Sequence, residues 1–313
     1  MYNKIIIDGN NFLYRAYYIQ RPPVLVDGVN TTPLHQFFYM LKNVRETYGA
    51  DNMYITWDKR LNSGGENFRK NLSAYKEHRL ETEDTHNIWA LCDTIQDILP
   101  HFGIATVLPY NLEADDVIGF LAEKEGSSLI VSSDKDMFQL VNNQTHILHR
   151  KNIVTIDNFE EIVGVPLDHF ILYKSIMGDV SDNVEGLEKY GPVRSKKLAA
   201  DIFKTGVTVE QLINDPATPL HIVSQEQKQK IINNLKISYL PYARKFEDEF
   251  ESYENQWNNR HNVVFDKDEV RAFFDKYKFH SFIREFGKWN TLFNKPTENE
   301  TTDLADILDF ISL

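Results

Sequence analysis

Nine acidic residues of this sequence are grouped in five short motifs. Two follow apolar runs on their own, at Asp8 and Asp58, and the others belong to LEADD, SSDKD and GDVSDN. The nine are Asp8, Asp58, Glu113, Asp115, Asp116, Asp134, Asp136, Asp179 and Asp182. Converging carboxylates repel one another unless divalent cations lie among them. Because neither His nor Cys occurs in these motifs, they favour Mg²⁺ or Mn²⁺ over Zn²⁺. Taken singly, Asp8 or Asp134 has the ordinary alternative of a helix N-cap, but capping does not require nine acids.

The elements that must position these acids alternate between strand and helix. Four apolar, β-branched runs are typical of buried strands and cover residues 4–7, 53–57, 104–108 and 129–131. Three segments with apolar residues at helical spacing cover residues 33–48, 84–99 and 112–125. This alternation predicts an α/β fold with a mainly parallel sheet and flanking helices. Ligands of such sheets bind beyond the carboxyl ends of the strands, where acids from four segments would meet.

Charge is unevenly distributed along the 313 residues. The net charge of −12 argues against a protein that coats nucleic acid non-specifically. Basic residues nevertheless gather at 60–79 and at 189–204. The first cluster lies in the long polar connection 59–83, and connections of this length in a compact domain are usually functional or disordered.

Other features of the composition concern location. No apolar run approaches the ~20 residues that span a bilayer, and the N-terminus has no signal-peptide pattern. The single cysteine, Cys92, lies in an apolar run and is expected in the core. We therefore expect a cytoplasmic protein without membrane contact.

Six motifs occur in the order and spacing of the flap endonuclease family. They are DGNNFLYRAYY, the strand end at Trp57 and Asp58, YKEHR, LEADDVIG, SSDKDMFQLV and GDVSDN. The sequence resembles this family over residues 1–203, most closely phage 5′-nucleases of the RNase H type and the 5′-nuclease domain of bacterial DNA polymerase I. The resemblance implies a PIN-like nuclease core, a basic helical arch and a C-terminal helical part. It also implies a structure-specific 5′ endonuclease and 5′→3′ exonuclease that removes flaps and RNA primers from RNA–DNA.

The resemblance implies a two-metal site made by the nine acids. The first Mg²⁺ would be held mainly by Asp8, Asp58, Glu113, Asp115 and Asp134. The second would be held by Asp136, Asp179 and Asp182, with Asp116 in an outer shell, and Mn²⁺ could substitute. All nine acids are present, which argues against a non-catalytic relative that only binds branched DNA.

The basic connection 59–83 resembles the helical arch of the family. Lys76 matches the catalytic lysine beside the scissile phosphate, and Arg79 lies one helical turn away. Tyr75 is expected to stack on the base that leaves the duplex. Arg15 and Arg69 are expected to contact phosphates. For each basic residue the ordinary alternative is a solvated surface charge.

Residues 183–200 resemble the helix–three-turn–helix element of the family. The implied duplex contacts are Gly186, Gly191, Arg194, Lys196 and Lys197. The family holds a monovalent cation such as K⁺ in this turn. Here the sequence EKY stands where the family has small residues between the two glycines. The sequence therefore does not decide whether the K⁺ site is kept. The alternative is a plain helical hairpin.

The expected organisation is a nuclease core at 1–157, a helical duplex-binding domain at 158–293, and a linker with a C-terminal peptide at 294–313. The aromatic run RAFFDKYKFHSF is expected in the core. The ending LADILDFISL has one apolar helical face, which either packs on the protein itself or docks on a sliding clamp or single-strand-binding protein. The other expected partners of this monomer are branched or nicked DNA and RNA–DNA hybrids.

Two other enzyme classes fit the sequence less well. A metal-dependent phosphatase with a DxD nucleophile would need a second acid two residues after Asp8, where Asn10 stands. A small toxin-like ribonuclease of similar core fold would lack the arch and the GDVSDN motif. The preference for RNA or DNA, and for flaps or nicks, does not follow from the sequence.

Overall fold

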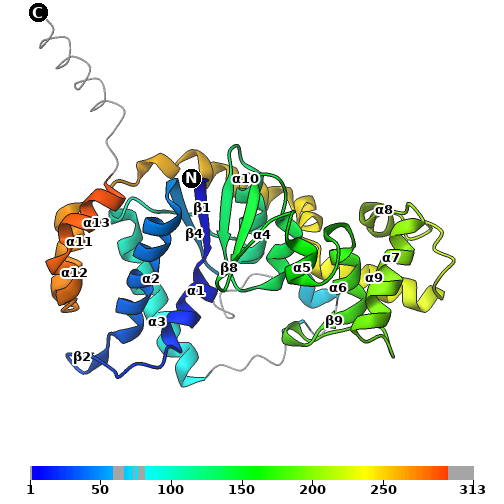
Figure 1. Ribbon diagram of the computed structural model, residues 1–313, viewed down its shortest axis with the longest axis horizontal. Helices are drawn as coiled ribbons and strands as arrows, with labels where there is room; N and C mark the ends of the chain where they lie inside the picture. Colours follow the sequence, from blue (N-terminus) through cyan, green and yellow to red (C-terminus); the bar gives the residue numbers. More distant parts are fainter. Residues whose placement is uncertain (1, 59–66, 73–74, 77–81, 295–313) are drawn as a thin grey trace, which may run out of the picture.

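The computed structural model describes residues 2–58, 67–72, 75–76 and 82–294 (Figure 1). Arg79 and the peptide 295–313 lie outside these residues. The predicted roles of both therefore remain predictions.

The described residues contain a six-stranded sheet in the order β5-β4-β1-β6-β7-β8. Its strands are β1 (Tyr2–Asp8), β4 (Ala50–Thr56), β5 (Ala105–Thr106), β6 (Ser128–Val131), β7 (Thr145–His149) and β8 (Asn152–Val154). All neighbouring pairs are parallel except β7 and β8. Ile5, Ile6 and Ile7 are fully buried, as expected of a central strand covered on both faces. The predicted α/β fold with a mainly parallel sheet is confirmed.

Helices cover both faces of this sheet. On one face lie α1 (Gly9–Tyr17), α2 (Thr32–Tyr48) and α3 (Glu83–Ile98), which bury Phe12, Phe37 and Cys92. On the other face lie α4 (Ala114–Glu123) and α10 (Glu247–Asn258), which bury Val117 and Tyr253. The predicted helices match α2, α3 and α4 to within about two residues at each end.

The last described helices return to the α2 face. They are α11 (Lys267–Lys276), α12 (His280–Arg284) and α13 (Phe286–Phe293). Phe274 and Trp289 are fully buried with Phe38 and Phe102 in the core of the sheet. The aromatic run therefore belongs to the core, as predicted. These helices share a core with the sheet, although the sequence pattern assigned them to a helical domain at 158–293.

Helix α5 (Phe159–Val163) packs its Phe159 into the sheet core beside α4 and α10. The helices that follow it have a core of their own, to one side of the sheet (Figure 1). They are α6 (Phe170–Met177), α7 (Pro192–Lys204), α8 (Val209–Asn214) and α9 (Gln225–Ser238). A short hairpin of β9 (Gly178–Asp179) and β10 (Val184–Glu185) follows α6. Ile176, Ile202 and Ile231 lie in the core between α6, α7 and α9. This arrangement connects the GDVSDN motif directly to the helical part.

Several short elements lie between these helices and strands. A two-stranded hairpin is formed by β2 (Leu25–Val26) and β3 (Val29–Asn30). The 3-10 helices are η1 (Phe68–Asn71), η2 (Leu99–His101), η3 (Lys135–Leu140), η4 (Leu167–His169), η5 (Val180–Asp182), η6 (Leu240–Lys245) and η7 (Arg260–Asn262). In the described part of the chain, no helix is both long enough and apolar enough to span a membrane.

Candidate metal and nucleic-acid site

Asp8 lies at the carboxyl end of the central strand and caps helix α1. Its Oδ1 accepts a hydrogen bond from the Asn11 amide at 3.0 Å, and its Oδ2 accepts one from the Ser132 hydroxyl at 2.8 Å. Burial, opposed by these bonds and reinforced by Asp58 and Asp134, raises the pKa of Asp8 to about 7. Asp8 is thus an N-cap and, at the same time, a member of a crowded acidic group.

The first turn of α1 and the loops after β4 and β6 are tied to one another by hydrogen bonds. The Asp58 amide donates to Asn10 Oδ1 at 2.7 Å, and Asp58 Oδ1 accepts from the Ala114 amide at 2.8 Å. Asn11 Oδ1 accepts from both the amide and the hydroxyl of Ser133, at 3.0 and 2.8 Å. Neither Asn10 nor Asn11 was assigned a role from the sequence, although the DGNN motif contains them. These two side chains fix the position of the acidic loops.

Asp134 and Asp115 add to the negative charge at this edge. Asp134 caps η3 by accepting from the Asp136 amide at 2.8 Å. Burial raises the pKa of Asp115 well above its ordinary range, and Asp134 and Asp8 raise it further. Raised carboxyl pKa values mark a buried excess of negative charge, which a divalent cation would relieve.

Glu113 has three positively polarised partners. Its Oε1 lies 2.9 Å from Lys76 Nζ, and its Oε2 accepts from the Tyr75 hydroxyl at 2.8 Å and lies 3.8 Å from Arg69 Nη1. Burial opposes ionisation, but Lys76 and Arg69 lower the pKa of Glu113 to about 2. The carboxylate of Glu113 therefore stays ionised and orients the ammonium group of Lys76.

Lys76 itself adopts an unusual backbone conformation. Its φ of 56° lies in the left-handed region, which residues with a Cβ rarely occupy. The Lys76 amide donates to the Asp182 carbonyl at 3.0 Å, so the GDVSDN motif holds the backbone of Lys76. Such strain is typical of functional sites.

The remaining acids form a second group around Lys174 on α6. Lys174 makes an ion pair with Asp136 and lies 3.1 Å from Asp179 Oδ2. Asp136, Asp179 and Asp182 line a narrow cleft together with Tyr75. Lys174 was not predicted from the sequence, where its only signal was one charge in the apolar run FILYKSIM.

Among the described side chains, no three from His, Cys, Asp and Glu are arranged as a ready metal site. Instead, three internal cations neutralise several of the acids. The cations are Arg69, Lys76 and Lys174. The oxygen-only donors and the raised carboxyl pKa values at the first group still fit hard divalent ions such as Mg²⁺.

Arg69 and Asp116 form a buried ion pair in the structure. Arg69 was expected to contact phosphate, but only 2% of it is exposed, and it donates to both oxygens of Asp116 at 2.8 and 2.7 Å. The assignment of Arg69 to phosphate contact is corrected, because a buried bidentate pair leaves its guanidinium unavailable. Asp116, also 2% exposed, accepts from Arg69 and from the Glu113 amide. Its expected place in the outer shell of the metal site does not require direct contact with an ion and remains a prediction.

The expectation for Tyr75 is also corrected. Its side chain is 4% exposed, packs with Val184 and Ile237, and donates to Glu113. It cannot stack on a base in this conformation.

The predicted duplex contacts of the helical part divide into two groups. Three basic side chains are exposed on the first turns of α7, namely Arg194, Lys196 and Lys197. Arg15, the other predicted phosphate contact, is exposed on α1. A Cβ on Gly186 would lie 2.2 Å from the Met177 carbonyl oxygen, so this glycine is required by packing within the chain. Contact of its backbone with a duplex remains a prediction. Gly191, at the N-cap of α7, has open space around it.

A comparison with models of protein families shows to which family this chain belongs. Residues 3–164 match the model described as 5′-3′ exonuclease, N-terminal resolvase-like domain. The chain belongs to the 5′-3′ exonuclease family. It is 30% identical over 234 residues to the 5′-3′ exonuclease of Mycoplasmopsis pulmonis, and this alignment covers 72% of this chain and 74% of that protein. It is also 30% identical over 238 residues to DNA polymerase I of Streptococcus pneumoniae, covering 67% of this chain and 26% of the polymerase.

Solved structures show the same fold. The 5′-exonuclease of bacteriophage T5 superposes with a TM-score of 0.58 at 18% identity, over 83% of this chain and 100% of that chain. The T5 protein co-crystallised with metal ions gives a TM-score of 0.60 at 18% identity, over 82% of this chain and 99% of that chain. This chain therefore has the nuclease fold that was predicted from its sequence.

Proposed function

We propose that this 5′-3′ exonuclease family member is a structure-specific 5′ nuclease that uses two divalent metal ions. Its substrates are flaps and recessed 5′ ends in DNA, and RNA primers paired to DNA. The observation that carries the proposal is the contact of Lys76 with Glu113, 2.9 Å apart at the acidic edge of the sheet. It brings a cation of the arch segment to the acids that would bind metal.

The acids would hold the ions in two groups. The first group is Asp8, Asp58, Glu113, Asp115 and Asp134, and the second is Asp136, Asp179 and Asp182. Bound Mg²⁺, or Mn²⁺ in its place, would supply an activated water and stabilise charge on the phosphate. Lys76 would offset the charge that builds up on the phosphoryl oxygens, assisted by Arg79. The T5 enzyme has been crystallised with DNA and metal ions, which supports this proposal.

Duplex DNA would bind at the start of α7. Helix α7 begins with Pro192 and has no side-chain cap at its N-terminus, and Arg194, Lys196 and Lys197 are exposed on its first turns. Non-specific phosphate contacts of this kind position a duplex without reading its sequence. A K⁺ ion in the preceding turn remains a prediction, as does contact of Arg15 with phosphate.

We further propose that the protein acts in the cytoplasm as a monomer. Its C-terminal peptide would dock on a sliding clamp or single-strand-binding protein. The support for this partner is the apolar face of LADILDFISL in an otherwise acidic segment.

The test is incubation with labelled 5′-flap, nicked and RNA–DNA substrates, with and without Mg²⁺. We expect cleavage near the 5′ branch point only when Mg²⁺ is present. Tight binding without cleavage in Mg²⁺ or Mn²⁺ would instead indicate a branched-DNA-binding relative. Release of phosphate from monoesters without strand cleavage would indicate a phosphatase.

A further inference from the structure

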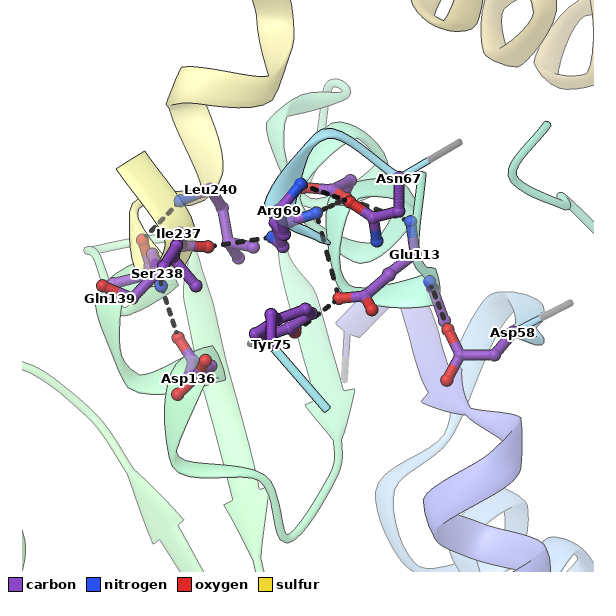
Figure 2. Close-up of polar contacts among 12 residues, drawn as sticks. Asp58, Asn67, Arg69, Tyr75, Glu113, Asp136, Gln139, Ile237, Ser238 and Leu240 are labelled. Atoms are coloured by element: carbon purple, nitrogen blue, oxygen red, sulfur yellow. Dashed lines mark hydrogen bonds and ion pairs between the residues drawn. The ribbon is translucent and has the colours of Figure 1, made fainter. Parts of the chain in front are cut away.

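Arg69 joins three segments that are distant in sequence. Its Nη1 and Nη2 donate to Asp116 on α4, and its Nε donates to the Ile237 carbonyl at the end of α9, at 2.9 Å. Figure 2 shows Arg69 between the main chain of Ile237 and the carboxylate of Glu113. The guanidinium also lies over the Phe68 ring, 4.8 Å from its centroid. Every side of this buried cation is thus in contact with the protein.

The partner of Arg69 controls the start of α4. Asp116 accepts from the Glu113 amide at 3.1 Å, and this capping box sets the backbone of Glu113. Glu113 in turn binds the Lys76 ammonium and the Tyr75 hydroxyl. A chain of contacts therefore runs from Arg69 through Asp116 and Glu113 to Lys76.

The end of α9 is held to the acidic edge by a second residue. Gln139 donates to the carbonyls of Asp136 and Ser238, both at 2.9 Å, and accepts from the Leu240 amide at 3.0 Å (Figure 2). The chain at Ile237, which packs on Tyr75, is therefore fixed on both sides. Arg69 therefore donates to a carbonyl whose position is fixed by neighbouring contacts, and not to the carbonyl of an untethered helix end.

We propose that Arg69 is a positioning residue of the nuclease, acting through Asp116 and Glu113 to place Lys76. The inference rests on the proposed function, because it assumes that Lys76 acts on the scissile phosphate. A planar guanidinium is required, since only a fork can bond both Asp116 oxygens and the Ile237 carbonyl together. Lysine in its place keeps the charge and loses that geometry.

The experiment is a double-mutant cycle of Arg69→Lys and Lys76→Ala on a 5′-flap substrate. Single-turnover cleavage with saturating Mg²⁺ and flap affinity without metal are measured for each protein. We expect Arg69→Lys to slow cleavage by about 10- to 10²-fold, the scale of a misplaced catalytic group, while affinity changes by less than about threefold. In the Lys76→Ala background, the same substitution should change the rate by less than about threefold, because residues that act together are non-additive.

Two further variants separate positioning from stability. Arg69→Met with Asp116→Leu replaces the buried pair by apolar groups, which preserves folding in such sites, and should show the same loss of rate. Lys228→Met removes a matched buried cation that binds the Pro216 and Thr218 carbonyls, and should leave the rate unchanged. Equal losses of rate from Arg69→Lys in both backgrounds, or a comparable loss in Lys228→Met, would overturn the proposal. Failure of the proposed function is distinguishable, because the unmodified protein would then not cleave the flap.

Discussion

The ammonium group of Lys174 lies 3.1 Å from Oδ2 of Asp179 and also pairs with Asp136. Burial opposes ionisation of Asp179, but Lys174 and the Ser181 hydrogen bonds lower its pKa. A lysine of α6 thus lies between two acids that we assign to the second divalent ion. The Lys174 ammonium group therefore provides a positive charge beside the carboxylates that we propose bind the second divalent ion.

Substitution of this lysine is expected to change metal binding directly. Lys174→Met should tighten divalent-ion binding by about tenfold, because a competing positive charge is removed from the two carboxylates. Without metal, the variant should melt at a lower temperature, since the acids then repel one another unrelieved. Titration calorimetry with Mn²⁺ and thermal melting check both effects.

A matched control uses another buried lysine. Lys42 on α2 pairs with Glu46 and Glu285, away from the acidic edge. Lys42→Met should affect melting but not the affinity for Mn²⁺. Unchanged affinity in Lys174→Met would contradict the assigned competition.

Loss of single acids from the first group should abolish most cleavage. Asp8→Ala or Asp134→Ala is expected to reduce the rate on the order of 10²-fold or more, while duplex affinity is retained, because bound metal stabilises the transition state rather than the bound duplex. Flap cleavage at saturating Mg²⁺ and binding by fluorescence anisotropy measure the two quantities. Asp275→Ala, an exposed acid on α11, is the control. Near wild-type turnover of either site variant would exclude the proposed site.

The two basic clusters should give opposite kinetic signatures. Lys76→Ala should lower single-turnover cleavage far more than affinity, because its charge acts on the reacting phosphate. Lys196→Ala with Lys197→Ala should mainly weaken binding and reduce its salt dependence by roughly one unit of slope for each phosphate that is no longer bound. Identical signatures from the two sets would show that our division between chemistry and duplex binding is wrong.

The sequence predicted the sheet well because its strands are buried on both faces. Runs such as Ile5 to Ile7 are continuous and apolar, so four strands and three helices were recognised from local pattern alone. The same pattern placed acids beyond the strand ends. The β7–β8 hairpin was not predicted, because His149 and Asn152 at its turn interrupt the apolar pattern.

The contacts of the basic residues could not be predicted in the same way. Arg69 resembled a surface charge, since its partner Asp116 lies 47 positions away and Ile237 lies 168 positions away. Whether an arginine is buried depends on which chain segments fold against it, and local sequence does not contain that information.

The C-terminal peptide offers a test of the proposed partner. Truncation after Pro296 should leave the melting temperature and the cleavage of bare flaps unchanged, and should abolish stimulation by a sliding clamp or single-strand-binding protein. Scanning calorimetry and cleavage assays with each partner measure these effects. A fall of several degrees in melting temperature would show instead that the peptide packs on the protein, since burial of an amphipathic face contributes more than about 1 kcal/mol.

The raised pKa of Asp8 predicts how metal binding depends on pH. In the metal-free protein this carboxyl has a pKa of about 7, because it is buried near Asp58 and Asp134. Metal requires the ionised form, so affinity for Mg²⁺ should fall as the pH drops below 7, by up to about tenfold per unit, with release of a proton on binding. Between the ordinary carboxyl pKa of about 4 and the folded value, only the folded protein holds this proton, so metal-free stability should decrease as pH rises through this window. The proton release can be measured directly. Calorimetry of metal binding at pH 6.5, in two buffers of different ionisation enthalpy, gives the number of protons released. Asp8→Asn, which keeps the side-chain shape, should reduce the number of protons released, and the proton held by Asp115, whose pKa is also raised, would still be released. Equal proton release from the unmodified protein and Asp8→Asn would show that Asp8 is already ionised before the metal binds.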